Sequence, residues 1–294
     1  MGVDALRRFM FTDFAVRGEV VRLEESWRAV MERQDYPPAV RALLGEAMAA
    51  CVLLASTLKF DGLLTLQIQG EGALSLLVVQ CDSELALRGL AKWQGEDPRG
   101  SLAELTGGGR LAITIERRNE PKRYQGIVSA DTDTLARCLE DYFAQSEQLP
   151  TRLWLAADDL RAGGLLLQQL PGETREADAD DDGWQRAGML ADTLAADELL
   201  QLEAETLLRR LYHEETLRLA AARPVSFHCS CNRQRVESAL RLLGRDELAQ
   251  LLSAEGRIEV RCEFCNRAYE LDTVDVEQVL SQAGIAPPAS DRLH

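Results

Sequence analysis

The sequence predicts an α+β fold with more than one domain. Short runs of alternating apolar and polar residues, typical of strands, are mixed with runs of helical spacing. An acidic stretch between Gly172 and Gly183 separates this region from a leucine-rich helical stretch. Four of the seven cysteines then fall in the last quarter of the chain. We therefore expect a mixed sheet packed with helices in residues 1–171, a helical linker in residues 172–227 and a small four-cysteine domain in residues 228–294.

The first segments predict one strand and two helices. Residues 14–23 alternate in polarity, as a strand does, and residues 24–33 follow with helical spacing. Residues 37–57 begin with two prolines and continue with small and apolar residues. Proline is favoured in the first turn of a helix, so this segment predicts a buried helix.

The remaining N-terminal segments predict two pairs of strands, one helix and two final strands. A Gly-Glu-Gly turn joins the first pair, and a longer basic turn joins the second. Aspartates at the start of the helix are suited to cap it. In chain order the segments are 63–69 and 73–80, 110–117 and 124–130, 131–148, and then 151–157 and 163–170.

The linker is expected to contain one long helix over residues 193–222. Strong helix formers dominate this stretch, and Arg223-Pro224 ends it. A helix of this kind needs a surface on which to bury its apolar face. The acidic run Asp178–Asp182 before it predicts a solvated loop. The apolar face consists of Leu200, Ala204, Leu207 and Leu211.

Net charge and the lengths of apolar runs predict the compartment of the protein and the classes of partner that it does not bind. Its formal net charge of −15 opposes nonspecific binding to phosphate backbones. The first residues lack an apolar stretch of signal-peptide length, and no later run reaches the roughly 18 apolar residues of a membrane helix. We therefore expect a soluble, cytoplasmic protein that binds neither nucleic acid nor membranes. Thiols stay reduced there, so clustered cysteines indicate metal or redox chemistry.

The seven cysteines fall into two groups. Cys51, Cys81 and Cys138 lie in apolar runs, and we expect them to act as small buried hydrophobic residues. The other four form two pairs in the tail, and these pairs carry the chemistry.

The tail cysteines predict a metal site. Cys229 and Cys231 form a C-x-C pair, and Cys262 and Cys265 form a C-x-x-C pair after thirty intervening residues. Four thiolates fill a tetrahedral zinc site and leave no open position, so one zinc ion here would be structural rather than hydrolytic. His228 adjoins the first pair, but four cysteines make it unnecessary as a ligand. A tail of about 65 residues with few aromatic residues depends on such a metal to fold.

Enzyme readings fit the residues less well, and we do not expect an enzyme. A zinc deaminase needs Pro-Cys-x-x-Cys, whereas Arg261 precedes Cys262. A thioredoxin-like enzyme needs its C-x-x-C near a βαβ unit, whereas this pair lies in a predicted hairpin. A cysteine hydrolase needs a partner histidine, and none of the three histidines is suitably placed. A zinc-ribbon module that binds nucleic acid and a thiol-disulfide oxidoreductase remain as alternatives.

The same thiols suggest a redox switch. If an oxidant attacked them, the nearest thiols in the sequence would pair, Cys229 with Cys231 and Cys262 with Cys265. Such disulfides close very small loops and restrict the unfolded chain little. The tail would then unfold, and the long helix expected over residues 193–222 would lose the surface that covers its apolar face.

Several stretches resemble a known family. The C-terminal ones are "HCSCNRQRVESALRLLG" and "GRIEVRCEFCNRAYEL", and "DYFAQSEQLPTRLWLA" lies earlier in the chain. Together with "LKFDGLLTLQIQGEGALSLLVVQC" and "YQGIVSA", they resemble the redox-regulated heat-shock chaperone family of the thirty-three-kilodalton class. The resemblance covers essentially the whole chain in the same order.

This resemblance implies an ATP-independent holdase that is largely inactive while reduced. By motif position, it implies one zinc ion held by Cys229, Cys231, Cys262 and Cys265. Under oxidative and unfolding stress the family releases zinc and forms two disulfides between near neighbours, and its linker, here roughly 171–227, loosens.

The resemblance also implies partners. The family captures unfolding client proteins and passes them to ATP-dependent chaperones. It is a monomer when reduced, and oxidation favours a homodimer. The acidic run Asp178–Asp182 does not map onto a feature of the family.

Overall fold

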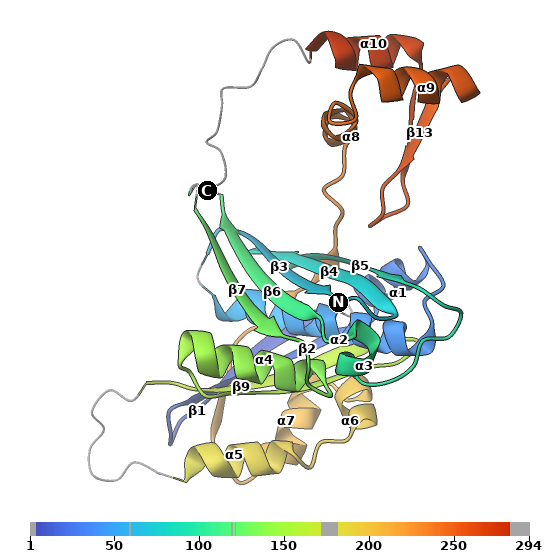
Figure 1. Cartoon of the computed structure of the whole chain (residues 1–294). Helices are drawn as coiled ribbons and strands as arrows, with labels where there is room; N and C mark the ends of the chain where they lie inside the picture. The colour runs from blue at the N-terminus through green and yellow to red at the C-terminus, as the bar shows by residue number, and fades with distance from the viewer. Residues whose placement is uncertain (1–3, 59, 119, 121, 172–181, 283–294) are drawn as a thin grey trace. The chain divides into compact units, whose positions relative to one another are not determined.

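The computed structural model describes residues 4–58, 60–118, 120, 122–171 and 182–282 (Figure 1). Contacts divide the chain into two compact units, Met1–His228 and Cys229–His294. Residues of the expected linker are thus grouped with the first unit. The acidic run Asp178–Asp182 of the expected linker, apart from Asp182, lies outside the described residues. That residues 172–227 act as a separate linker stays a prediction.

The first sheet of the N-terminal unit is antiparallel. Its strand order is β10-β1-β2-β9-β8, and β11 also pairs with β1. Two short strands from the end of the unit therefore complete the outer edge of β1, which leaves fewer of its backbone groups unpaired. The strands are β1 (Ala5–Phe11), β2 (Val16–Leu23), β8 (Thr151–Ala157), β9 (Ala162–Gln169), β10 (Leu217–Leu219) and β11 (Arg223–Pro224).

The second sheet is mixed, because the short strand β12 joins β5 in parallel while the other neighbours are antiparallel. Its order is β12-β5-β4-β3-β6-β7. The predicted α+β class is confirmed, with two sheets where the sequence suggested one. The strands are β3 (Gly62–Gln69), β4 (Leu74–Asp82), β5 (Ala86–Trp93), β6 (Arg110–Arg117), β7 (Arg123–Ser129) and β12 (Ser226–Phe227).

Helix α2 (Pro38–Thr57) lies between the two sheets and contacts strands of both (Figure 1). Its small and apolar side chains let both sheets approach closely, so it forms the centre of the main core. Smaller helices complete the layer. They are α1 (Glu25–Met31), α3 (Leu102–Thr106), α4 (Leu135–Tyr142) and the π-helical turn η1 (Phe143–Glu147).

Helix α2 corrects one expectation. By length and composition it is apolar enough to cross a membrane, although no such run was expected. In the structure 78% of the most apolar 18-residue stretch of this helix is buried inside the protein. A core helix of a soluble protein has the same properties, so the helix is weak evidence for a membrane.

Three helices cover the opposite face of the first sheet and form a second apolar core with it (Figure 1). They are α5 (Gly183–Ala191), α6 (Ala196–Gln201) and α7 (Ala204–Tyr212). The prediction of one long helix over residues 193–222 is wrong. The chain is extended at Leu202 and Glu203 between α6 and α7, and residues 217–219 form β10. Helix propensity is a weak preference, and packing on the sheet and pairing with β1 override it here.

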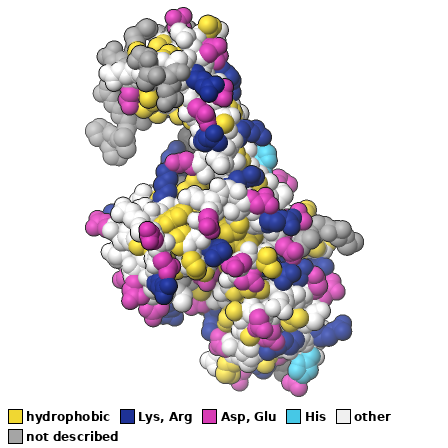
Figure 2. Space-filling view, turned by 90° about the vertical axis from the view of Figure 1, so that its right-hand side faces the viewer, with side chains coloured by type: hydrophobic (Ala, Val, Ile, Leu, Met, Phe, Trp, Pro, Cys, Tyr) yellow, Lys and Arg dark blue, Asp and Glu magenta, His cyan; other side chains and the backbone are white. Residues whose placement is uncertain are grey.

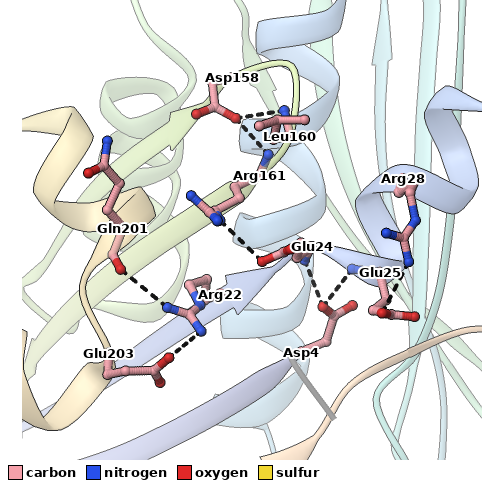
Figure 3. A network of polar contacts seen from close by, with 10 residues as sticks. All are labelled: Asp4, Arg22, Glu24, Glu25, Arg28, Asp158, Leu160, Arg161, Gln201 and Glu203. Carbon is pink, nitrogen blue, oxygen red and sulfur yellow. Dashed lines mark hydrogen bonds and ion pairs between the residues drawn. The ribbon is translucent and has the colours of Figure 1, made fainter.

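Polar contacts also join these helices to the sheet. Arg22 of β2 donates to the Gln201 carbonyl oxygen at 3.4 Å and to the Glu203 carboxylate at 2.5 Å (Figure 3). Arg7 of β1 pairs with Glu205 at 3.1 Å. Ion pairs with one exposed partner contribute only about 0–1 kcal/mol each. Apolar contacts therefore provide most of the attachment.

The described part of the C-terminal unit, up to residue 282, is a hairpin with three helices around a small core. Its expected hairpin is confirmed. The core consists mainly of Val236, Leu240, Leu248, Ile258, Leu271, Val276 and Val279. The elements are α8 (Arg233–Leu240), α9 (Arg245–Glu255), β13 (Ile258–Arg261), β14 (Ala268–Leu271) and α10 (Thr273–Gln282).

Candidate metal centre

The four tail cysteines lie in two loops of the C-terminal unit. Cys229 and Cys231 precede α8, and Cys262 and Cys265 lie in the turn between β13 and β14. The Asn232 side chain accepts a hydrogen bond from the Arg235 backbone N–H at 2.9 Å and caps α8. An N-cap fixes where a helix begins, so the helix starts directly after the C-x-C pair.

The hairpin turn positions the second pair. The Cys262 N–H donates to the Arg267 carbonyl oxygen at 2.9 Å, and the Asn266 N–H donates to the Cys262 carbonyl oxygen at 2.7 Å. Asn266 has a φ of +57°, a left-handed conformation that asparagine tolerates better than most residues. Backbone N–H groups of the turn also donate to both sulfur atoms. The turn thus presents two sulfurs on one side.

The four sulfur atoms form a compact cluster. All lie within 4.8 Å of one another, with Cys229 Sγ to Cys262 Sγ at 3.7 Å and Cys231 Sγ to Cys265 Sγ at 3.3 Å. Four zinc–sulfur bonds of about 2.3 Å in a tetrahedron would place the sulfurs about 3.8 Å apart. The arrangement could therefore hold one metal ion, and soft sulfur donors fit zinc.

Electrostatics also favour a cation at this position. Burial, together with hydrogen bonds that the Cys265 thiol donates to the neighbouring sulfurs, raises the pKa of Cys265 to about 12. Burial likewise raises the pKa of Cys262 above its ordinary value. Four negative thiolates at this spacing repel one another unless a positive ion lies between them.

Tyr269 of β14 is a site residue that the sequence analysis missed. Its hydroxyl donates a hydrogen bond to Cys231 Sγ at 3.1 Å. The Arg267 side chain is hydrogen-bonded to the same tyrosine. The only signal in the sequence is spacing. Arg267 lies two residues before Tyr269, just ahead of β14, and side chains two residues apart in an extended chain lie on one side.

The two closest sulfur contacts join one pair to the other. Cys229 is close to Cys262, and Cys231 is close to Cys265. These distances alone do not favour disulfides within each pair. The pairing of Cys229 with Cys231 and of Cys262 with Cys265 stays a prediction.

The other three cysteines are buried, as expected. Cys51, Cys81 and Cys138 are each 0% exposed. Burial raises the pKa of Cys138 to about 11 and also raises the pKa values of Cys51 and Cys81. Thiolates are the reactive form, so these three thiols are protected from oxidants in the folded unit. His228 is not part of the sulfur cluster, and its backbone N–H donates to the Leu87 carbonyl oxygen at 2.9 Å.

Charges of both signs are interspersed on the surface in Figure 2. A nucleic-acid interface needs Lys and Arg gathered in a patch or stripe. The described part of this face shows no continuous basic stripe.

Comparisons with known proteins agree on one family. The family model described as "Hsp33 protein" matches residues 4–272. A 33 kDa chaperonin of Nitrosococcus oceani is 48% identical over 289 residues, with 98% of each chain covered. A 33 kDa chaperonin of Methylobacillus flagellatus is 43% identical over 292 residues, with 99% of each chain covered.

A solved structure shows the same fold. The crystal structure of the 33 kDa chaperonin from Thermotoga maritima matches with a TM-score of 0.79 at 24% identity. The match covers 96% of this chain and 99% of that one. At this identity the likeness concerns the fold alone.

Proposed function

This chain belongs to the Hsp33 protein family of chaperones, and we propose that it is an ATP-independent holdase that oxidation activates. The single observation that carries the proposal is the sulfur cluster. Two segments separated by thirty residues bring four sulfurs within 4.8 Å of one another.

In the reduced state, we assign Cys229, Cys231, Cys262 and Cys265 as ligands of one zinc ion. Bound zinc would supply a cross-link between the C-x-C segment and the β13–β14 turn. Structural zinc contributes about 10–16 kcal/mol in small domains, whereas a whole domain is stable by only about 5–15 kcal/mol. The small C-terminal core therefore depends on this cross-link, and the chaperone stays largely inactive while it holds.

Oxidation removes the ligands. One thiolate of each pair attacks a peroxide oxygen, the O–O bond breaks and hydroxide leaves. The second thiolate then displaces the oxygen from the sulfur as a second hydroxide, so each pair gives up two electrons to one peroxide. We propose that Cys229 pairs with Cys231 and Cys262 with Cys265. These bonds lie within single loops and cannot replace a cross-link between them.

Loss of the cross-link has a structural consequence. We propose that the C-terminal unit unfolds and that helices α5–α7 loosen from the first sheet. The face that they cover is apolar, and unfolding proteins expose apolar surface that can be buried against it. Its buried residues on the sheet side are Phe9, Phe11, Phe14, Val16, Val20, Ala156, Leu165 and Leu167.

We further propose how the chaperone works with other proteins. It acts in the cytoplasm, binds unfolding client proteins and later passes them to ATP-dependent chaperones. The reduced chain is a monomer, and the oxidised chain forms a homodimer.

One experiment tests the switch. The reduced, zinc-loaded chain is treated with peroxide under mild warming. Released zinc is followed with a chromogenic chelator, and light scattering follows the aggregation of a heat-sensitive reporter enzyme. We expect zinc release and suppression of aggregation to rise together. Equal suppression before and after oxidation would contradict the proposal.

The same samples test the alternatives. A thiol-disulfide oxidoreductase would turn over a small disulfide substrate, and a zinc-ribbon module would bind nucleic acid while zinc is present. We expect neither, because the C-x-x-C pair lies in a hairpin turn and the chain carries a net charge of −15.

A further inference from the structure

The contact between Tyr269 and Cys231 connects two parts of the C-terminal unit. Tyr269 lies in β14 opposite Val260 of β13, and its hydroxyl reaches the sulfur of Cys231, 38 residues earlier in the chain. The O–S distance of 3.1 Å is short for a hydrogen bond to sulfur. The hairpin thus holds the C-x-C segment through a side chain as well as through the proposed metal.

Arg267 extends this contact. Its side chain has no acceptor atom, so in its hydrogen bond to Tyr269 it donates to the phenolic oxygen. A donor at that oxygen directs the hydroxyl hydrogen towards the sulfur and polarises the O–H bond. Hydrogen bonds in a chain strengthen one another. The positive charge also lies near the sulfurs of Cys231 and Cys265 and attracts them when they are ionised.

The sulfurs differ in the origin of their hydrogen bonds. Cys262 and Cys265 accept bonds from backbone N–H groups of their own turn, which are present whatever the side chains are. Cys231 accepts a bond from a side chain on another element. Substitution of one residue can therefore change the surroundings of Cys231 and leave those of the turn intact.

We propose that Tyr269, oriented by Arg267, is a positioning residue that sets how readily Cys231 gives up the metal and reacts with oxidants. The inference rests on the proposed function. The hydrogen bond holds the sulfur next to Cys265. It also occupies a lone pair that would otherwise attack peroxide, so it slows formation of the S–O bond.

The hydroxyl can be removed without removing the ring. Tyr269 is partly buried and packs against the small C-terminal core. Phenylalanine keeps this packing, so Tyr269→Phe tests the hydroxyl alone. Outer partners of metal ligands typically contribute about 10–100-fold to metal affinity. We expect Tyr269→Phe to lower zinc affinity about tenfold and to raise the rate of zinc release by peroxide by a similar factor.

The experiment measures both quantities in the full chain. Zinc affinity is obtained by competition with a chelator, and release is followed at a fixed peroxide concentration. Tyr124→Phe is the matched control, because it removes the hydroxyl of a half-exposed tyrosine, which contacts Glu147 in the N-terminal unit. Arg267→Gln is a second variant at an exposed side chain, and Arg267→Lys restores its charge. We expect Arg267→Gln to move both quantities in the same direction as Tyr269→Phe and Arg267→Lys to recover part of the effect.

The outcomes separate this inference from the proposed function. A change of about threefold or more in both quantities for Tyr269→Phe, with Tyr124→Phe unchanged, supports the inference. Smaller changes, or slower release, overturn it. If Tyr269→Phe does not fold, Arg267→Gln decides by the same threshold. If the wild-type chain binds no zinc, the proposed function fails as well. If it binds zinc and the variants match it, only the role of Tyr269 fails.

Discussion

Serine at position 231 keeps the size of the side chain but replaces sulfur with oxygen, a much poorer ligand for zinc. We expect Cys231→Ser to bind zinc weakly and to unfold the C-terminal unit, because its small core needs the cross-link. The N-terminal unit should stay folded. Zinc content and the hydrogen-exchange protection of each unit measure the two effects.

Ser230→Ala is the matched control for this variant. Ser230 lies between the two cysteines, and its hydroxyl accepts a hydrogen bond from Arg235 at 2.6 Å. The control should keep zinc and protection in both units. Unfolding of the whole chain in Cys231→Ser would contradict the independence of the two units.

Glu46 makes stability depend on pH. Burial in α2 raises its pKa from 4.5 to about 7. As pH rises from about 4.5 to 7, the carboxyl ionises in the unfolded chain but not in the folded one, so stability falls. Above about 7 both forms are ionised and the loss is complete.

Glu46→Gln should remove this loss. We expect its melting temperature to equal that of the wild type near pH 4.5 and to exceed it by a growing margin up to about pH 7, with a plateau above. Thermal unfolding across this pH range measures the margin. Glu214→Gln, at a side chain that is 87% exposed, is the control. A margin that does not change with pH would exclude the ionisation of Glu46 as its cause.

At the scale of elements, helix α7 is held on the first sheet by its leucines. Leu207 is 0% exposed, and its truncation to alanine removes about 2–5 kcal/mol of packing. We expect Leu207→Ala to loosen the helices without oxidant. Aggregation suppression and binding of an apolar dye under mild warming should both appear in the reduced, zinc-loaded variant.

Met189→Ala supplies the comparison. Met189 lies in α5 and is 63% exposed, so its truncation should change little. If reduced Leu207→Ala stayed as inactive as the control while melting earlier, the covered face would not be the client-binding surface.

Elements with strong patterns could be predicted from the sequence, and the others could not. Helix α2 and the pair β3 and β4 follow from proline, glycine and alternation alone. The chain from α6 to β10 could not be predicted, because its leucines suit one helix and only the sheet decides where they lie. Strand β1 carries arginines in its centre, at Arg7 and Arg8, which pair with Glu205 and Glu19. Those partners lie on other elements, so local polarity gave no sign of a strand.

The candidate site shows the same division. C-x-C and C-x-x-C spacing predicted which residues would gather, because two short chelating loops need little else to meet at one ion. The role of Tyr269 could not be predicted, since it depends on how the hairpin packs against a loop 38 residues away. The disulfide pairing is not determined by the folded geometry either, because all four sulfurs are neighbours.

At the scale of the whole molecule, the two units should respond differently to loss of metal. We expect a strong chelator to unfold the C-terminal unit and leave the N-terminal unit folded, since the latter has its own large core. Thiol alkylation then counts the cysteines that have become reactive. Four cysteines should react quickly, and Cys51, Cys81 and Cys138 more than about a hundredfold more slowly, because they are buried and their pKa values are raised.

Denaturant should make all seven thiols reactive. Alkylation in the presence of zinc is the control and should be slow at every position. Rapid labelling of Cys138 after chelation alone would mean that the N-terminal unit also opens.

The pairing of β1 with β10 has a consequence during synthesis. Phe9 lies opposite Leu219, so β1 leaves the ribosome about 200 residues before the strand β10 that it pairs with. At about 5–20 residues per second, this delay is roughly 10–40 s. Helices α5–α7 are also synthesised only near the end of this delay. The nascent chain therefore exposes its phenylalanine-rich face during most of its synthesis. Every newly made molecule can bind other apolar surfaces through this face until the helices cover it.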